Sequence, residues 1–224
     1  PNAKLIQINQ NKNQSNIILC MRTKNFTLIK PRAVGDRITN MSLGHSSDAQ
    51  GYGYGLTLYE PENGYIFEPE LSQNHGDNIY IGKAWGSNVV SLPKNITIVR
   101  PIVHHARRNC ISLTAWDNVK IIDPIMSYGG DSDGITGAFP KSCLDVELEE
   151  AEGFPIAQGF KGLITNPQLL NSSNGLFFYC SGNDRSFDIN ITGVSTFSGI
   201  NTIAVGAYYG GSNCTGKVYI ENVD

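Results

Sequence analysis

Apolar and polar residues alternate along most of this chain, in short segments that end at turn residues. One recurrent segment has four residues. The first is small or polar, the second and fourth are apolar, and the third varies. The first apolar positions of its copies are Leu56, Ile79, Ile111, Leu144, Leu176 and Ile203, and an earlier copy is predicted at 16–19. Alternation with period two predicts a short strand in each copy rather than a helix.

A second recurrent segment lies between these copies and consists of a strand-like run followed by proline. It occurs at 26–31, 65–69, 96–101, 119–124 and 163–167, and later copies at 187–194 and 218–223 lack the proline. Since proline cannot donate a backbone hydrogen bond, it marks the end of a strand. Each repeat of 23 to 33 residues therefore holds two or three short strands.

A repeat of this size cannot bury its own apolar side chains, and stacking the repeats buries them in one continuous core. The predicted fold class is all-β: a right-handed parallel β-helix of about seven coils, forming a single domain over residues 1–224. Leucine-rich repeats are excluded because their Leu-Asn frame is missing. Propeller blades, the second choice, need four antiparallel strands per repeat.

Composition narrows the classes of partner. Charged residues make up 17% of the chain, the net charge is -3 and no basic cluster is present, so no nucleic-acid partner is expected. No apolar run is long enough for a membrane-spanning helix, and no membrane insertion is expected. The first residues lack a signal-peptide pattern and an initiator methionine. We therefore expect a piece of a longer chain.

Neither the cysteines nor the acidic turn residues predict a metal site or a cofactor. The five cysteines include no C-x-x-C pair, which argues against zinc and for reduced thiols in strands. Asp131 and Asp133 lie in a stretch rich in Gly and Ser that predicts an ordinary turn.

The residues that flank the inward apolar positions should point away from the core. They form two predicted columns, Thr57, Tyr80, Ser112, Asp145, Phe177 and Ala204, and Tyr59, Gly82, Thr114, Glu147, Tyr179 and Gly206. Because paired strands lie ~4.8 Å apart, these columns should form one polar and aromatic surface, here named the outer strip. Asp77, His75, Arg107 and Arg108 precede its strands.

The carboxylates of the outer strip are candidates for acid–base chemistry. Asp145 and Glu147 share one face of a strand, and Asp77 is expected two coils away, roughly 10 Å along the axis. Two carboxylates that flank a sugar linkage act as acid and base or as acid and nucleophile. Arg107 or Arg108 could balance a third carboxylate or bind an anionic sugar. The alternative is that these acids only keep the sheet surface soluble.

Five segments resemble the pectate-lyase-like β-helix of bacteriophage tailspike depolymerases. They are 31–37, 53–58, 76–82, 106–113 and 143–147, and the resemblance covers roughly residues 16 to 200. This chain has Asn78, Cys110 and Cys143 where the family usually has Gly, and Leu148 where it commonly has Pro. The larger side chains narrow the expected groove without changing the fold.

The resemblance implies an endo-acting depolymerase that cleaves capsule, exopolysaccharide or lipopolysaccharide O-chain. It implies catalytic roles for Asp77, Asp145 and Glu147 and a substrate contact at Arg108; the other expected substrate contacts are Arg107, Tyr80, His75, Tyr59 and Tyr179. Family members are homotrimers of the phage tail, so we expect a homotrimer located in the virion and made in the bacterial cytoplasm. A polysaccharide lyase, a non-catalytic glycan-binding module and a purely structural β-helix are the alternatives.

Overall fold

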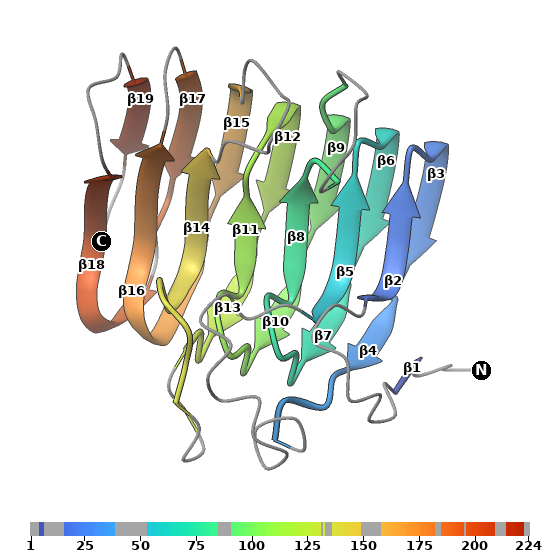
Figure 1. Cartoon of the computed structure of the whole chain (residues 1–224), viewed down its shortest axis with the longest axis horizontal. Helices are drawn as coiled ribbons and strands as arrows, with labels where there is room; N and C mark the ends of the chain where they lie inside the picture. Colours follow the sequence, from blue (N-terminus) through green and yellow to red (C-terminus); the bar gives the residue numbers. More distant parts are fainter. Residues whose placement is uncertain are drawn as a thin grey trace.

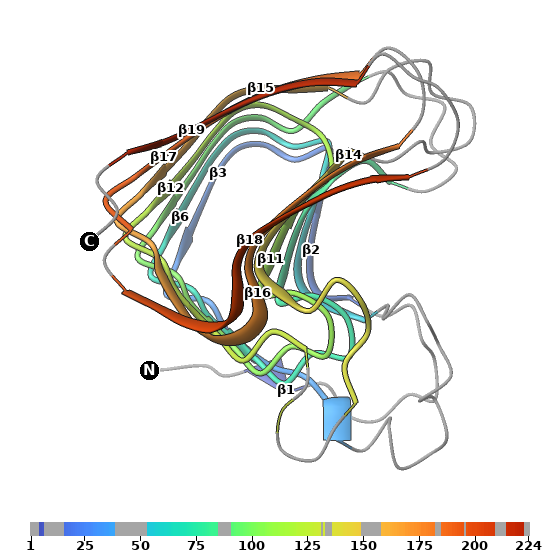
Figure 2. The ribbon, with the colours of Figure 1, turned by 90° about the vertical axis from the view of Figure 1, so that its left-hand side faces the viewer.

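The computed structural model describes residues 5–6, 16–38, 53–84, 91–130, 132, 136–148, 158–181, 185–194, 196–208 and 214–221. This part of the chain is nearly all β. Its strands lie side by side in sequence order along the longest axis of the molecule (Figure 1). Seen along that axis, the parallel sheets form a nearly closed, barrel-like wall around the core (Figure 2).

One sheet has seven strands, each paired in parallel with strands about one repeat away in the chain. Its order is β19-β17-β15-β12-β9-β6-β3. Its members are β3 (Lys24–Ile29), β6 (Glu62–Phe67), β9 (Lys94–Val99), β12 (Trp116–Ile122), β15 (Gln158–Thr165), β17 (Arg185–Thr192) and β19 (Cys214–Glu221).

The other sheet has twelve strands and consists of two parallel ladders joined by bent strands. The first ladder contains β1 (Leu5–Ile6), β4 (Arg32–Val34), β7 (Glu70–Ser72), β10 (Ile102–His104) and β13 (Ile125–Ser127). The second contains β2 (Asn16–Met21), β5 (Tyr54–Tyr59), β8 (Ile79–Gly82), β11 (Ile111–Leu113) and β14 (Ser142–Leu148). β16 (Gln168–Ser181) pairs first with β13 and then with β14, and β18 (Thr196–Tyr208) follows it along both ladders.

The pairing register confirms the column predicted from the recurrent segment; its first five members are buried, whereas Ile203 is 47% exposed. Leu56, Ile79, Ile111, Leu144, Leu176 and Ile203 are successive partners. The prediction was wrong by one residue at the first copy, where Ile18 rather than Ile17 pairs with Leu56. Cys20 is buried there while Leu19 is 47% exposed, and five consecutive apolar residues, 17–21, had hidden the alternation.

In the described part of the chain the core is a column of aliphatic side chains that also includes the aromatic residues Trp116 and Phe178. Leu56, Ile98, Ile121 and Leu144 are fully buried, and the indole of Trp116 packs among them. Burying each aliphatic side chain contributes about 1.5–3 kcal/mol relative to leaving it in water. Stacked repeats therefore stabilise one another, as their apolar pattern requires.

The predicted strand–proline segments form corners between the two sheets. The residue before each proline has a positive φ: Lys30, Glu68, Arg100, Asp123 and Asn166 lie between 47° and 51°. This left-handed conformation turns the chain sharply, and the proline carbonyl then accepts a hydrogen bond from the next coil, as from the Glu70 amide to Pro31 at 2.9 Å. The corners of successive coils also contact one another through side chains, as Arg100 does Glu68.

A second set of left-handed residues is a ladder of asparagines on the seven-stranded sheet. Asn25, Asn63, Asn95 and Asn118 have φ between 53° and 61°. Each side-chain amide hydrogen-bonds to the next at 2.8–3.0 Å. Asparagine tolerates this conformation better than most residues, so the ladder combines local geometry with contacts between coils.

Candidate functional site

The outer strip lies on the ladder β5–β8–β11–β14–β16, and its register agrees with the prediction. Thr57, Tyr80, Ser112, Asp145 and Phe177 are successive partners, and Glu147 pairs with Tyr179. The strip faces away from the apolar core but is largely covered: Asp145 and Ser112 are fully buried, and Tyr80 is 5% exposed. The expectation of an open, solvated strip is therefore wrong for these positions.

Arg108 gathers the three predicted carboxylates. Its Nη2 lies 2.6 Å from Glu147 Oε2 and 3.9 Å from Asp145 Oδ2, and its Nη1 lies 3.7 Å from Asp77 Oδ2. Arg108 precedes β11, Asp77 precedes β8, and the other two residues are in β14. Residues from three coils thus meet at one guanidinium.

The electrostatics of this cluster are dominated by the acids. Burial alone would lower the pKa of Arg108, but Asp77, Glu147 and Asp145 outweigh it and raise that pKa well above its usual range. With all four groups ionised, three anions face one cation. The guanidinium is therefore firmly charged, and the cluster remains net negative.

Asn109 connects the coils behind this cluster. Its amide Nδ2 donates to Asp145 Oδ2 at 2.9 Å and to Ser112 Oγ at 3.1 Å. Its Oδ1 accepts from the backbone and hydroxyl of Ser142, and its own backbone N–H donates to Asp77 Oδ1 at 3.0 Å. One fully buried residue thereby fixes two of the three carboxylates.

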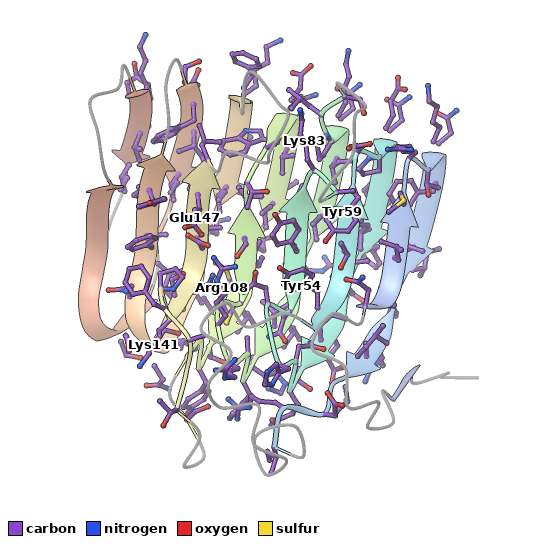
Figure 3. The ribbon with its side chains drawn as sticks, viewed as in Figure 1. Tyr54, Tyr59, Lys83, Arg108, Lys141 and Glu147 are labelled. Carbon is purple, nitrogen blue, oxygen red and sulfur yellow. The ribbon has the colours of Figure 1, made fainter. Side chains whose placement is uncertain are left out.

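The members of the cluster differ in access to solvent. The side chains of Asp77 and Asp145 are fully buried, whereas those of Glu147 and Arg108 are 10% and 11% exposed. Figure 3 places Glu147 and Arg108 next to each other over β14 and β11. Glu147 is therefore the carboxylate that an external molecule reaches first.

Aromatic rings flank the cluster on the β5–β8 side. Tyr54 stacks on Tyr80 with ring centroids 4.7 Å apart, and Tyr59 meets Tyr80 edge to face at 5.7 Å. Burial raises the pKa of the Tyr54 phenol well above its usual value, and Tyr80 and Asp77 raise it further. Thr114 donates a hydrogen bond to the Tyr80 hydroxyl at 3.0 Å.

A second aromatic group lies on the β16 side. Phe177 stacks on Tyr179 at 6.3 Å, and Phe139 meets Phe177 edge to face at 5.1 Å. Phe139 belongs to the segment before β14, and its carbonyl accepts a hydrogen bond from Arg108 Nε at 3.3 Å. The carboxylate cluster therefore has aromatic neighbours in both directions along the axis.

His75 and Arg107, two further predicted substrate contacts, lie beside each other. Arg107 Nη1 is 3.3 Å from His75 Nε2, and both residues are 2% exposed. In this arrangement they support the corners before β8 and β11 instead of offering an open contact surface. Tyr59 and Tyr179 remain partly exposed.

Sequence reasoning overlooked the connecting role of Asn109 and the contribution of Phe139. The signal for Asn109 was its place just before the recurrent segment that begins at Cys110, where the other copies also have polar residues such as Asp77 and Ser142. Phe139 carried no such signal, because the segment before β14 does not repeat. Asp131 and Asp133 lie outside the described residues.

Among the described residues, no group of three or more His, Cys, Asp or Glu side chains is arranged to hold a metal ion. In the same part of the chain, no helix has the length and apolar character needed to cross a membrane. Comparison of the chain with protein-family models, with curated proteins and with solved structures finds no match. The resemblance to tailspike depolymerases therefore stays a prediction.

Proposed function

We propose that this chain is an endo-acting glycoside hydrolase that cleaves a bacterial surface polysaccharide, and that its fold is a right-handed parallel β-helix. The observation that carries the proposal is the cluster of Asp77, Asp145 and Glu147 around Arg108. Paired carboxylates are the usual catalytic groups of glycosidases. The partly exposed rings of Tyr59 and Tyr179, one on either side, offer apolar faces to sugar rings.

The parallel pairing supports the β-helix. Strands pair across repeats rather than with their neighbours in sequence, as in β3, β6 and β9. Corners with proline and a left-handed residue before it recur at the same place in five repeats. Right-handed crossovers are by far the commoner connection between parallel strands.

Glu147 is assigned the direct contact with the scissile sugar, and Asp145 supplies the second carboxylate. Both lie close to the same Arg108 nitrogen, so their oxygens are separated by no more than the sum of the 2.6 and 3.9 Å contacts. Inverting enzymes need about 6.5–9.5 Å between carboxyl groups, and retaining enzymes about 5–5.5 Å. That upper limit is compatible with a retaining mechanism through a covalent glycosyl intermediate. Arg108 must move aside for a sugar to reach Asp145.

Charge favours hydrolysis over β-elimination. A lyase must neutralise the carboxylate of a uronate, commonly with Arg, Lys or a metal ion. Here Arg108 already faces three carboxylates, and the cluster is net negative. An anionic sugar at this position would meet repulsion at close range.

The test is a digestion of a panel of capsular polysaccharides. We expect new reducing ends without the near-ultraviolet absorbance of unsaturated uronates. Glu147→Gln should lower the rate at least a hundredfold while binding persists, because acid–base groups contribute about that much. Glu70→Gln, a matched change of an exposed carboxylate in β7, should leave the rate unchanged. Cleavage by Glu147→Gln and Asp145→Asn at the original rate would exclude this site.

A non-catalytic glycan-binding module is the second candidate, and the complete burial of Asp77 and Asp145 favours it. In that case the aromatic groups bind the polysaccharide and the acids only stabilise the sheet. If the protein binds polysaccharides but releases reducing ends from none of them, the binding module is the correct function.

A further inference from the structure

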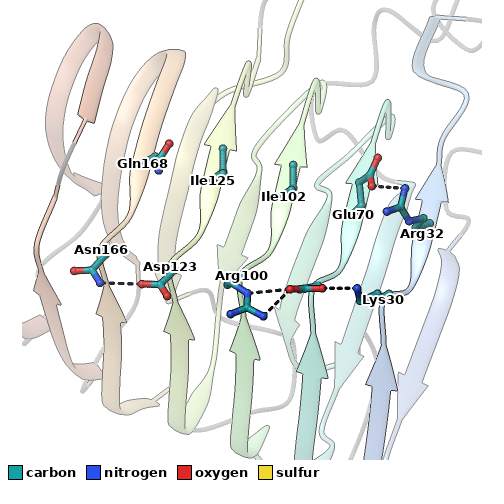
Figure 4. A pocket seen from close by; sticks show the side chains of 10 residues that line it. Lys30, Arg32, Glu70, Arg100, Ile102, Asp123, Ile125, Asn166 and Gln168 are labelled. Carbon is teal, nitrogen blue, oxygen red and sulfur yellow. Dashed lines mark hydrogen bonds and ion pairs between the residues drawn. The ribbon is translucent and has the colours of Figure 1, made fainter.

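A row of alternating charges runs along the outside of the molecule, at the corner between the two sheets. It consists of Lys30, Glu68, Arg100 and Asp123, here named the corner ladder. Lys30 Nζ lies 2.9 Å from Glu68 Oε2, and Arg100 Nη2 lies 2.6 Å from Glu68 Oε1. The Lys30 and Arg100 side chains are more than half exposed. Figure 4 shows the row ending at Asn166, which donates a hydrogen bond to Asp123.

The signs along the corner ladder are positive, negative, positive and negative, one charge for each coil. When a second copy of this row is turned end to end and laid against the first, every charge lies opposite a charge of the other sign, because the row alternates and has four members. Opposite a reversed copy, Lys30 faces Asp123 and Glu68 faces Arg100, and both pairs then occur twice. A copy laid in the same direction would place each charge against its like.

We propose that the corner ladder is an interface at which two copies of this chain pair in antiparallel orientation, about a two-fold axis perpendicular to the stack. Such an axis generates a closed, isologous contact in which each surface meets itself. The proposal concerns a face other than the carboxylate cluster and stands independently of the glycosidase activity. It predicts a dimer contact, in contrast to the homotrimer implied by the family resemblance.

Apolar side chains beside the ladder give this contact its driving force, because exposed ion pairs by themselves contribute little. The last residues of the adjoining strands are Ile29, Phe67, Val99 and Ile122. Ile29 is 71% exposed, and the other three are partly exposed. The same two-fold axis places this apolar column against itself, with Ile29 opposite Ile122 and Phe67 opposite Val99.

The other side of the ladder is a groove of about 450 Å³, lined by the first residues of β7, β10 and β13 among others. Ile102 in its floor is 43% exposed. The charges of its column do not alternate, since Arg32 pairs with Glu70 at 2.6 Å and two isoleucines follow. The same axis places Ile102 opposite Glu70 and Ile125 opposite Arg32, so this side adds no apolar pair to the contact, and the groove leaves room for water there.

Charge exchange between Lys30 and Asp123 tests the proposal. In one chain these residues stand three coils apart, roughly 14 Å, so they do not contact each other. In the antiparallel pair they are direct partners. Lys30→Asp and Asp123→Lys should each raise the dissociation constant of the dimer about tenfold, because each places like charges together twice. The double variant restores opposite charges across the interface and should return to the original constant.

Sedimentation velocity over a range of concentrations measures the constant, and circular dichroism checks the fold of each variant. The substitutions also create repulsion within one chain, for example between Glu68 and the carboxylate that Lys30→Asp introduces. The double variant carries the repulsion of both single variants, so effects within one chain cannot explain a recovery of the dimer. Lys24→Asp, the same charge change at the other end of β3, should have no effect. Asp123→Asn, which keeps an acceptor for Asn166, should weaken the dimer about threefold. A chain that stays monomeric, a dimer indifferent to the single changes, or a double variant without recovery overturns the proposal.

Discussion

Replacing Arg108 with Ala tests the energetics of the carboxylate cluster most directly. The change removes the cation that lies within 3.9 Å of Asp77, Asp145 and Glu147. Two of these carboxylates are fully buried, so water cannot take the place of the guanidinium without rearrangement. Removing one partner from a buried ion pair costs about 3–5 kcal/mol. We expect a loss in that range near pH 7.

The loss should depend on pH in a defined direction. Without Arg108, burial and mutual repulsion disfavour the charged forms of the two fully buried carboxylates, Asp77 and Asp145, so their pKa values in the folded variant lie above those in the unfolded chain. A group with a raised folded pKa favours folding at low pH, and this contribution disappears as the pH rises through the folded pKa. The stability difference between variant and original protein should therefore shrink as the pH falls from about 7 to about 5.

Urea denaturation followed by circular dichroism measures the free energy of unfolding at both pH values. Arg32→Ala is the matched control, because Arg32 pairs with Glu70 at 2.6 Å but its side chain is 44% exposed. That change should cost less than about 1 kcal/mol. Arg108→Lys keeps the charge and should lose less than Arg108→Ala. A loss below that of the control, or one that grows as the pH falls, would refute the reasoning.

Two further substitutions test the fold, and an alkaline titration tests a buried tyrosine. Asn95→Ala should cost about 1–2 kcal/mol in urea denaturation, because alanine is strained at positive φ and two ladder hydrogen bonds are lost. Gly159→Ala should cost about 1–3 kcal/mol, since a Cβ there meets the Trp116 ring, and Trp116→Phe in the same chain should recover part of it. In an alkaline absorbance titration Tyr54 should ionise well above the ordinary range of a phenol, and stability should fall once the pH exceeds about 10, because the raised pKa favours the neutral phenol in the folded state.

The sequence predicts the parallel pairing well because alternation and repeat spacing are local signals. Leu56 and Ile79 are 23 residues apart and Ile111 and Leu144 are 33 apart, yet both are register partners. Insertions fall into corners, which change length without moving the strands. Among the described strands, the predicted register fails at 16–21, where adjacent apolar residues make two alternations equally good.

The composition of the candidate site was predictable, but its burial was not. Strand geometry alone brings Asp145, Glu147 and Tyr80 onto one face. The segment before β14 contributes to the surroundings of the site, since its carbonyl at Phe139 accepts a hydrogen bond from Arg108 and the Phe139 ring contacts Phe177. That segment has no counterpart of equal length in the other coils, so no repeat pattern predicts its course.

The free-energy cost of burying the charged groups of the cluster bears on its function. Taking three carboxylates and a guanidinium out of water carries a large desolvation penalty, and well-packed apolar residues often stabilise a protein better than a buried ion pair. The same sheet shows that this chain packs apolar side chains readily, since Val146, between Asp145 and Glu147, is fully buried. A net negative group beside partly exposed tyrosines is therefore a poor solution for stability alone. The cluster suits the proposed glycoside hydrolysis, because that reaction needs a proton on one carboxylate and a negative charge on another.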